Sequence, residues 1–328
     1  MKKIIPVILA SIMILTLFAA CTDATAGTTQ TPSNQSAQAP AGNAPAANAP
    51  ASGNAAPASG NTAPASGNAA PVSNFDTSRI IAVLTREDGS GTRDAFINTT
   101  GVGSDMYAEA IVFNETNQIL TNVETNEYAI GYVSVGSLSD KVKALTVDGV
   151  APSDATIKDG SYTVQRPLLV CVNAEKAETE LVKDFISFML SAQGQEISGT
   201  KWTMINANAP TYTPRGLNGT LKVGGSTSVE PLMQALRQAY IALNPGVELE
   251  ISGGGSGTGI SEATSGVLDI GMSSRALRDT EKENLTGTDI ALDGVAIIVN
   301  PNNPVTNMSI EQIKDIFTGA VTRWSGVG

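Results

Sequence analysis

Short runs of serine, threonine and glycine recur in this sequence where an apolar segment gives way to a helical pattern. They stand at residues 89–92, 226–228, 256–258 and 273–274. At such a junction the unpaired N–H groups of a helix N-terminus, with their partial positive charge, lie beside small hydroxyl side chains. Loops at the ends of neighbouring strands gather at one edge of an α/β sheet. One junction alone is typical of an ordinary turn with an N-cap, but four together predict an α/β fold with an oxyanion site.

The first junction carries the most chemistry. An apolar run at 80–84 leads into residues 86–93, Arg-Glu-Asp-Gly-Ser-Gly-Thr-Arg, and a helical pattern begins at about the last of these. Arg86 offers a planar fork of N–H donors that matches an oxyanion, and Asp88 is placed to hold that fork. Further hydroxyl donors follow at Ser90 and Thr92. The segment therefore predicts one half of an oxyanion site.

The N-terminus, residues 1–20, is typical of an export signal. Two lysines precede an apolar run that ends at Phe18, and small residues follow. Cys21 then stands where the lipobox of bacterial lipoproteins has its acylated cysteine, although Phe18 occupies a position where leucine is usual. The alternative is a transmembrane anchor, for which the run is short. We therefore predict a signal peptide and lipidation at Cys21.

Residues 21–74 are predicted to be a disordered tether behind that cysteine. From residue 22 onward they consist of Ala, Pro, Gly, Ser, Asn, Thr, Gln and Val with one charged residue and no aromatic residue. The sequence Ala-Pro-Ala-Ser-Gly-Asn occurs three times, at 49–54, 56–61 and 63–68. Such a composition cannot bury enough apolar surface to form a core.

The remaining chain, residues 75–328, is acidic and lacks histidine. It keeps 18 of the 20 basic and 30 of the 31 acidic residues, because only Lys2, Lys3 and Asp23 precede it, and its net charge is −12. This charge argues against a nucleic-acid partner. The lack of histidine removes histidine-based catalysis and most zinc sites, so we expect no metal, no cofactor and no enzyme activity. Cys171 lies in an apolar strand pattern and is predicted to be a core residue without a disulfide.

Together these segments resemble the phosphate-binding lipoproteins of bacterial phosphate ABC importers, the PstS family. The matching segments are residues 86–93, 224–228 with Pro231, 253–259, 269–275, 291–296, and 316–319 with Trp324. The resemblance implies a type II periplasmic-binding-protein-like clamshell. In this fold two α/β lobes are joined by two crossing strands, which would lie near 166–173 and 290–300.

The order of the segments departs from that family. Family members reach the Arg-Glu-Asp-Gly-Ser-Gly-Thr-Arg segment last, whereas here it comes first. We interpret this as a circular permutation with its join at 213–219. One lobe would then be residues 163–299 and the other 75–162 plus 300–328. Gly328 would lie close to residues 75–79.

The resemblance also implies the ligand contacts. These residues would bind phosphate: Arg86, Ser90, Gly91, Thr92, Thr227, Ser228, Ser256 and Ser274. Asp88 would orient Arg86. Some family members carry aspartate at the position of Ser274, where it accepts a proton from hydrogen phosphate and repels sulfate. With Ser274 in its place, selectivity for phosphate over sulfate must come from elsewhere or be weaker. Arg275 is more typical of a structural ion pair than of a ligand contact.

The expected function is capture of inorganic phosphate and its delivery to the permease of an ABC importer, at the extracellular face of the cell membrane. A phosphatase or phosphotransferase would need a nucleophile with a base, or clustered metal ligands, and the sequence shows neither. A sensor or adhesin that uses the same clamshell to bind a protein partner, or another oxyanion such as sulfate, remains an alternative.

Overall fold

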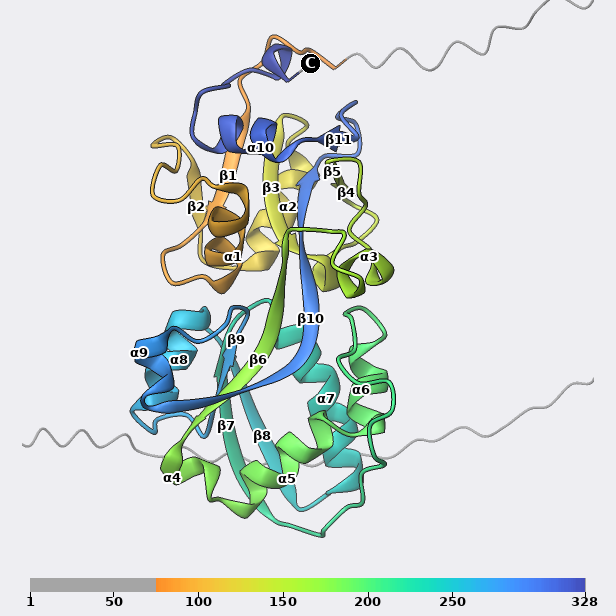
Figure 1. Cartoon of the computed structure of the whole chain (residues 1–328), viewed down its shortest axis with the longest axis vertical. Coiled ribbons are helices and arrows are strands. Elements are labelled where there is room, and N and C mark those ends of the chain that lie inside the picture. Colours follow the sequence, from red (N-terminus) through yellow and green to blue (C-terminus); the bar gives the residue numbers. More distant parts are fainter. Residues whose placement is uncertain (1–74, 328) are drawn as a thin grey trace, which may run out of the picture. The chain divides into compact units, whose positions relative to one another are not determined.

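The computed structural model describes residues 75–327 (Figure 1). The predicted signal peptide, Cys21, the predicted tether up to residue 74, and Gly328 lie outside the described residues. In the described part of the chain, no helix is both long enough and apolar enough to cross a bilayer.

Within residues 75–327, nine strands form one mixed sheet in the order β2-β1-β3-β10-β6-β9-β7-β8, with β4 paired to β10. The strands are β1 (Ala82–Arg86), β2 (Ile111–Phe113), β3 (Ala129–Ser134), β4 (Lys143–Ala144), β6 (Gln165–Asn173), β7 (Gly219–Gly225), β8 (Val247–Gly253), β9 (Ile270–Ser273) and β10 (Leu285–Val299). A second, two-stranded sheet pairs β5 (Thr146–Val147) with β11 (Asn307–Met308).

Helices connect and cover these strands. They are α1 (Gly91–Thr100), α2 (Thr116–Thr125), α3 (Asp154–Lys158), α4 (Ala174–Ala177), α5 (Glu180–Met189), α6 (Ala192–Ser198), α7 (Glu230–Leu243), α8 (Ser256–Thr264), α9 (Asp279–Lys282) and α10 (Ile310–Phe317), with short 3₁₀ turns η1 (Val135–Ser137) and η2 (Trp324–Gly326).

The sheet contains two groups of three parallel strands. β2, β1 and β3 form one group, and β9, β7 and β8 form the other. Two long antiparallel strands, β6 and β10, lie between the groups and pair with each other from Leu285 opposite Asn173 to Gly294 opposite Gln165. Beyond that point β10 pairs with β3. The predicted crossing strands are therefore present (Figure 1). β10 begins at Leu285, before the predicted start. The apolar pattern missed this part of the strand because most of residues 286–289 are polar.

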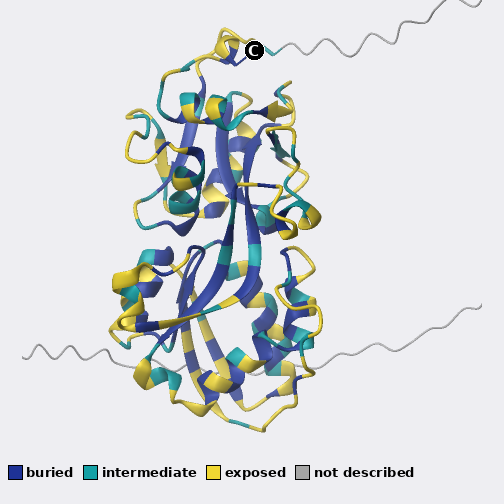
Figure 2. Ribbon diagram, viewed as in Figure 1, coloured by how far each residue is buried: buried dark blue, intermediate teal, exposed yellow. Residues whose placement is uncertain are grey.

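Buried side chains form separate cores on the two sides of this crossing (Figure 2). Two cores draw on residues from Leu168 to Ala291, whereas two others draw on residues up to Val164 and from Val295 onward. We propose two lobes on this basis, lobe I with the first two cores and lobe II with the other two. The second half of β10 then packs in lobe II, and not in lobe I as the sequence boundary had it.

A buried ion pair ties the crossing strands together. Arg166 of β6 donates from Nη2 to Asp293 Oδ2 of β10 at 2.9 Å, and Ser134 Oγ at the end of β3 donates to the other carboxylate oxygen at 3.0 Å. All three residues are buried. The contact fixes β10 against a strand of each lobe.

The two ends of the described chain lie together in lobe II. The Ile81 amide donates to the Thr322 carbonyl at 2.9 Å, and the Ser325 amide donates to the Thr77 carbonyl at 2.6 Å. The ring of Phe75 also packs edge-on against Trp324, with the centroids 5.7 Å apart. A permuted chain requires this proximity, but the permutation itself remains a prediction.

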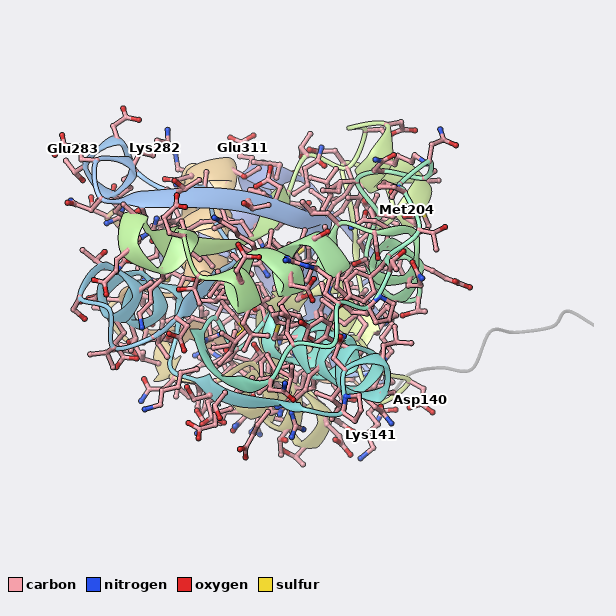
Figure 3. The ribbon with its side chains drawn as sticks, turned by 90° about the horizontal axis from the view of Figure 1, so that it is seen from below. Asp140, Lys141, Met204, Lys282, Glu283 and Glu311 are labelled. Carbon is pink, nitrogen blue, oxygen red and sulfur yellow. The ribbon has the colours of Figure 1, made fainter. Side chains whose placement is uncertain are left out.

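Cys171 lies in β6 and is fully buried, as predicted. Burial raises the pKa of its thiol to about 12. Charged side chains such as Lys282 and Glu283 instead lie on the outside of the molecule (Figure 3).

Candidate functional site

Each group of parallel strands sends its carboxyl ends toward the same region between the lobes. α1 and α2 begin there after β1 and β2 of lobe II, and α7 and α8 begin there after β7 and β8 of lobe I. The first-turn amides of a helix have no carbonyl four residues earlier in the helix to bond. Four helix N-termini, with their dipoles, therefore surround this region.

The N-termini of α1 and α7 are capped in different ways. Ser90 is the N-cap of α1, where its Oγ accepts from the Arg93 amide at 3.4 Å. The N-cap of α7 is Val229, and no side chain caps this helix. The Ser226 carbonyl oxygen instead accepts a hydrogen bond from the Val229 amide at 3.1 Å. This arrangement leaves the hydroxyl of Ser228 to face lobe II.

Arg86 ends β1 and is almost completely buried, with 2% of its surface exposed. Its Nε and Nη2 donate to the two carboxylate oxygens of Glu87 at 2.8 and 3.0 Å. The guanidinium also donates to the carbonyl oxygens of Phe113 and Asn114 and to the hydroxyls of Thr116 and Thr227. Glu87 therefore holds one side of the fork, and the Nη1–Nη2 end points toward hydroxyl groups from both lobes.

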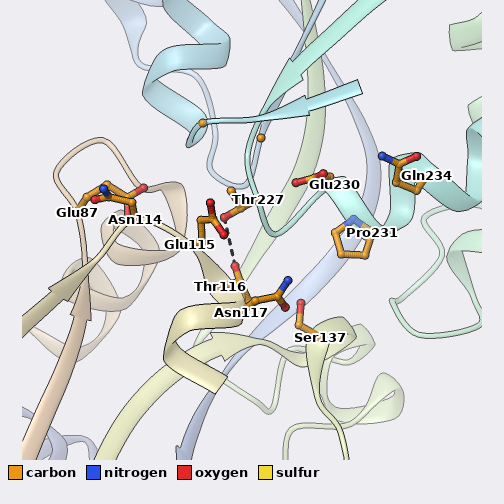
Figure 4. Close-up of a pocket in the computed structure, with 12 residues that line it drawn as sticks. Glu87, Asn114, Glu115, Thr116, Asn117, Ser137, Thr227, Glu230, Pro231 and Gln234 are labelled. Carbon is orange, nitrogen blue, oxygen red and sulfur yellow. Dashed lines mark hydrogen bonds between the residues drawn. The ribbon is translucent and has the colours of Figure 1, made fainter. Parts of the chain in front are cut away.

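Hydroxyl groups of the two lobes meet directly beside this guanidinium. Thr92 Oγ1 of α1 and Ser228 Oγ of lobe I are 2.8 Å apart. Thr116 is the first residue of α2, and its Oγ1 lies 3.2 Å from Thr227 Oγ1 (Figure 4). The same oxygen lies 3.4 Å from Ser228 Oγ. Each hydroxyl both donates and accepts, so these groups can bond each other or a ligand oxygen by rotating.

A second group of hydroxyls lies against the start of α1. Ser256 Oγ and Ser274 Oγ are 3.3 Å apart, and Ser226 Oγ donates to Ser274 Oγ at 2.9 Å. A β-carbon added at Gly91 would stand 2.5 Å from Ser256 Oγ and 2.7 Å from Ser274 Oγ. Gly91 is therefore required here by close packing between the lobes. Of the eight residues that were predicted to contact phosphate, seven lie in these two groups, and Ser90 is the N-cap of α1 next to Gly91.

Tyr132 fixes Arg86 from behind. The backbone N–H of Arg86 donates to the Tyr132 hydroxyl at 3.2 Å, and Thr85 Oγ1 lies 2.7 Å from the same oxygen. Burial raises the pKa of Tyr132 to about 12, so the phenol stays neutral. Its ring stacks on Phe96 of α1 at 4.0 Å between centroids. The end of β1 is thereby locked to β3 and α1.

Asp88 does not orient Arg86, contrary to the prediction. Its side chain is 96% exposed and pairs with Arg93 on the first turn of α1. The chain turns away from the site after β1, so Glu87 folds back on Arg86 while Asp88 points outward. Arg275 is an ion-pair residue, as the sequence favoured, because it binds Glu281 through two hydrogen bonds of 2.7 Å.

Sequence reasoning missed three residues of this site: Glu87, Thr116 and Ser226. Glu87 and Ser226 lie inside segments that had been singled out, one residue away from those chosen. Thr116 had a weaker signal, because the strand before its helix, β2, is only three residues long. A threonine opening a helix was the available clue.

An open cavity of about 680 Å³ adjoins the hydroxyl cluster. Polar and acidic residues line most of it (Figure 4): Glu87, Asn114, Glu115, Thr116, Asn117, Ser137, Thr227, Glu230 and Gln234. Within residues 75–327, no group of three or more acidic or cysteine side chains is arranged to hold a metal ion. The cavity therefore borders Glu87, Thr116 and Thr227, whose side chains accept hydrogen bonds from Arg86.

Known proteins are similar to this chain in sequence and in fold. A family model described as a PBP superfamily domain matches residues 73–193 and 209–328. The phosphate-binding protein PstS 2 of Streptococcus pneumoniae serotype 4 is 40% identical over 264 residues, which cover 78% of this chain and 90% of that protein. The chain belongs to the PstS family.

Other PstS relatives match this chain over different shares of its length. PstS 2 of Streptococcus agalactiae serotype V is 40% identical over 263 residues and is covered to 89% of its length. The crystal structure of a phosphate-binding protein of a phosphate ABC transporter from S. pneumoniae TIGR4 matches with a TM-score of 0.63 and 39% identity, over 76% of this chain and all of that one. PstS of Bacillus subtilis is 32% identical over 114 residues, which are 34% of this chain and 38% of that protein.

Proposed function

We propose that this PstS-family protein captures inorganic phosphate between its two lobes and delivers it to the permease of an ABC importer. The observation that carries the proposal is the convergence of Arg86 with hydroxyls of both lobes at four helix N-termini. The family membership supports it, because the relatives named above are phosphate-binding proteins, one of them of a phosphate ABC transporter.

Phosphate would bind here through dipoles and neutral donors more than through net charge. Glu87 compensates Arg86 in this buried region, and the chain as a whole carries a net charge of −11. Hydroxyls that now bond each other across the lobes would turn their donors to phosphate oxygens. The Nη1–Nη2 end of Arg86 would bind two of those oxygens as a fork. The ligand would thus replace interlobe contacts and hold the lobes closed.

The acceptors among the hydroxyl groups of the cluster are neutral. Ser274 Oγ accepts a hydrogen bond from Ser226, and the same oxygen can accept a hydrogen bond from hydrogen phosphate. Sulfate also fits a set of hydroxyl donors, so we propose that discrimination against sulfate is weaker here than in a site with a carboxylate at this position. The residues Arg86, Ser90, Gly91, Thr92, Thr227, Ser228, Ser256 and Ser274 are the proposed ligand contacts, and we add Thr116.

The proposal includes binding without turnover and attachment to the outer face of the cell membrane through a lipid on Cys21. The support for attachment is the sequence of residues 1–21. Mass spectrometry of the mature N-terminus tests it, since an unmodified Cys21 or an uncleaved signal would contradict it.

Calorimetric titration tests the binding function. Phosphate, sulfate and a phosphate monoester are titrated into the protein, with release of phosphate from the ester followed in parallel. We expect phosphate binding without ester turnover, and a loss of about 2–4 kcal/mol in binding free energy for Arg86→Ala, as when one partner of a buried charge-assisted contact is removed. Asp88→Asn is the matched control and should bind normally.

The possible outcomes separate the alternatives. Turnover of the ester would make the protein an enzyme. Binding of none of the oxyanions would favour a sensor or adhesin that binds a protein partner. Normal phosphate affinity in Arg86→Ala would place the ligand elsewhere.

A further inference from the structure

Ion pairs join the two lobes outside the proposed phosphate site. Asp94 lies in α1 of lobe II, whereas Arg275 and Arg278 follow β9 of lobe I. Asp94 Oδ2 lies 3.0 Å from Arg275 Nε and accepts a hydrogen bond from Arg278 Nη2 at 2.8 Å. We propose that Asp94 is a latch residue that holds the lobes together and prolongs the lifetime of the phosphate-bound state, an inference that rests on the proposed function.

The latch is coupled to the site through short segments of chain. Asp94 follows Thr92 by two residues on the same helix, and Arg275 directly follows Ser274. The site packs Gly91 tightly against Ser274. A motion that separates these two residues must therefore also separate Asp94 from Arg275.

The environment of the latch makes its charges effective. The side chains of Asp94 and Arg275 are 18% and 9% exposed, whereas that of Arg278 is 62% exposed. The hydrogen bonds from Arg275 to Glu281 raise the pKa of the guanidinium and hold it in place within lobe I. Little side-chain entropy is then lost when Asp94 approaches, and partly buried pairs contribute more than exposed ones.

A simpler role for Asp94 must be separated from the latch. A carboxylate in the first turns of a helix stabilises the helix through its dipole. That role lies within lobe II, and it affects the stability of the protein without affecting how long a ligand stays bound. The rate of phosphate release therefore distinguishes the two roles.

The first test compares phosphate dissociation rates of the full chain and Asp94→Asn by stopped-flow with a phosphate trap. We expect the rate of release to rise about tenfold while the association rate changes little, as for loss of a partly buried charge contact. Asp94→Glu keeps the charge and should restore most of the slow release. Glu180→Gln is the matched control, because it removes an exposed pair with Arg215 within lobe I, and it should leave the rate unchanged.

A double-mutant cycle makes the test specific to contacts between the lobes. Arg278→Gln should speed release less than Asp94→Asn does, because Arg278 is more exposed. In the Asp94→Asn background it should have almost no further effect, since its partner has already been removed. Additive effects of the two substitutions would overturn the latch.

A measurement without ligand separates failure of the latch from failure of the proposed function. Trp202 of lobe I packs against Gly136 of lobe II, where a β-carbon would stand 2.0 Å from the indole nitrogen. With Trp324→Phe, Trp202 is the one tryptophan left in the chain. We expect acrylamide to quench its fluorescence more strongly after Asp94→Asn.

Unchanged quenching together with an unchanged release rate would overturn the latch even if phosphate binds. Absence of phosphate binding by the unsubstituted protein would overturn the proposed function, and the quenching result would still decide whether Asp94 holds the lobes together.

Discussion

Glu87, and not Asp88, holds Arg86 in this structure, and the two carboxylates can be compared by one substitution each. Glu87→Gln keeps the length of the side chain and removes its charge. The amide oxygen can still accept one hydrogen bond from Arg86, but the second contact and the charge compensation are lost. The buried guanidinium would then be left with carbonyl and hydroxyl acceptors.

The size of the effect follows from the contacts. The two contacts, at 2.8 and 3.0 Å, are charge-assisted, and one such bond contributes about 1.5–3 kcal/mol. The Glu87 side chain is 19% exposed, so water screens part of the interaction. We expect Glu87→Gln to lower the free energy of unfolding by about 2 kcal/mol, which corresponds to a fall in Tm of about 4–8 °C for a folded region of this size.

Urea unfolding, followed by circular dichroism without phosphate, measures this difference. Asp88→Asn is the control, and it should leave the unfolding midpoint unchanged because its side chain is 96% exposed. Equal losses for the two variants would refute the assignment of Glu87. An unchanged midpoint in Glu87→Gln would show that Arg86 needs no carboxylate partner.

Three further predictions follow from other contacts. Gly91→Ala places a β-carbon 2.5 Å from Ser256 Oγ, so we expect at least tenfold weaker phosphate binding by calorimetry with the protein still folded; unchanged affinity would contradict the packing argument. Hydrogen bonds from Arg275 hold the pKa of Glu281 below its ordinary value of 4.5, so its contribution to stability is present above about pH 4.5 and is lost as the pH falls through the lower folded-state pKa. Glu281→Gln should therefore reduce the loss of stability on acidification, measured as Tm against pH. The same fall in Tm at acidic pH in the variant and the unsubstituted protein would exclude a contribution of Glu281 to this loss. Cys171 is buried and the pKa of its thiol is raised to about 12, so, in a variant without the other cysteine, iodoacetamide at pH 8 should label it only after unfolding; rapid labelling of the native protein would contradict its burial.

The comparisons also bear on the order of the segments. The S. pneumoniae relative aligns along 90% of its length, whereas the B. subtilis relative aligns along 38%. A difference in segment order produces such partial matches, because a sequential alignment can follow only one of two exchanged parts. The permutation relative to the B. subtilis protein remains a prediction. A crystal structure of the present protein would test it by superposition on B. subtilis PstS, once with the segments in chain order and once with the permuted segments exchanged.

Local sequence was sufficient for the junctions. An apolar run, small hydroxyl residues and a helical pattern follow one another within about ten residues, so the chain itself places Ser90 or Ser256 at the end of a strand and the start of a helix. The expectation of two lobes came from the resemblance to the PstS family and not from these local units. The junctions depend on near neighbours, and they appear in the structure where the sequence places them.

Tertiary structure decided which of these groups touch one another. Thr116 enters the site because the short β2 pairs with β1, which brings the start of α2 beside Arg86. The choice of Glu87 over Asp88 depends on how the chain turns after β1, and the pairing of Asp94 with Arg275 depends on how the lobes meet. A sequence specifies the donors along the chain, but the direction of each side chain, and its partner across a gap of many residues, is set by packing that no local pattern contains.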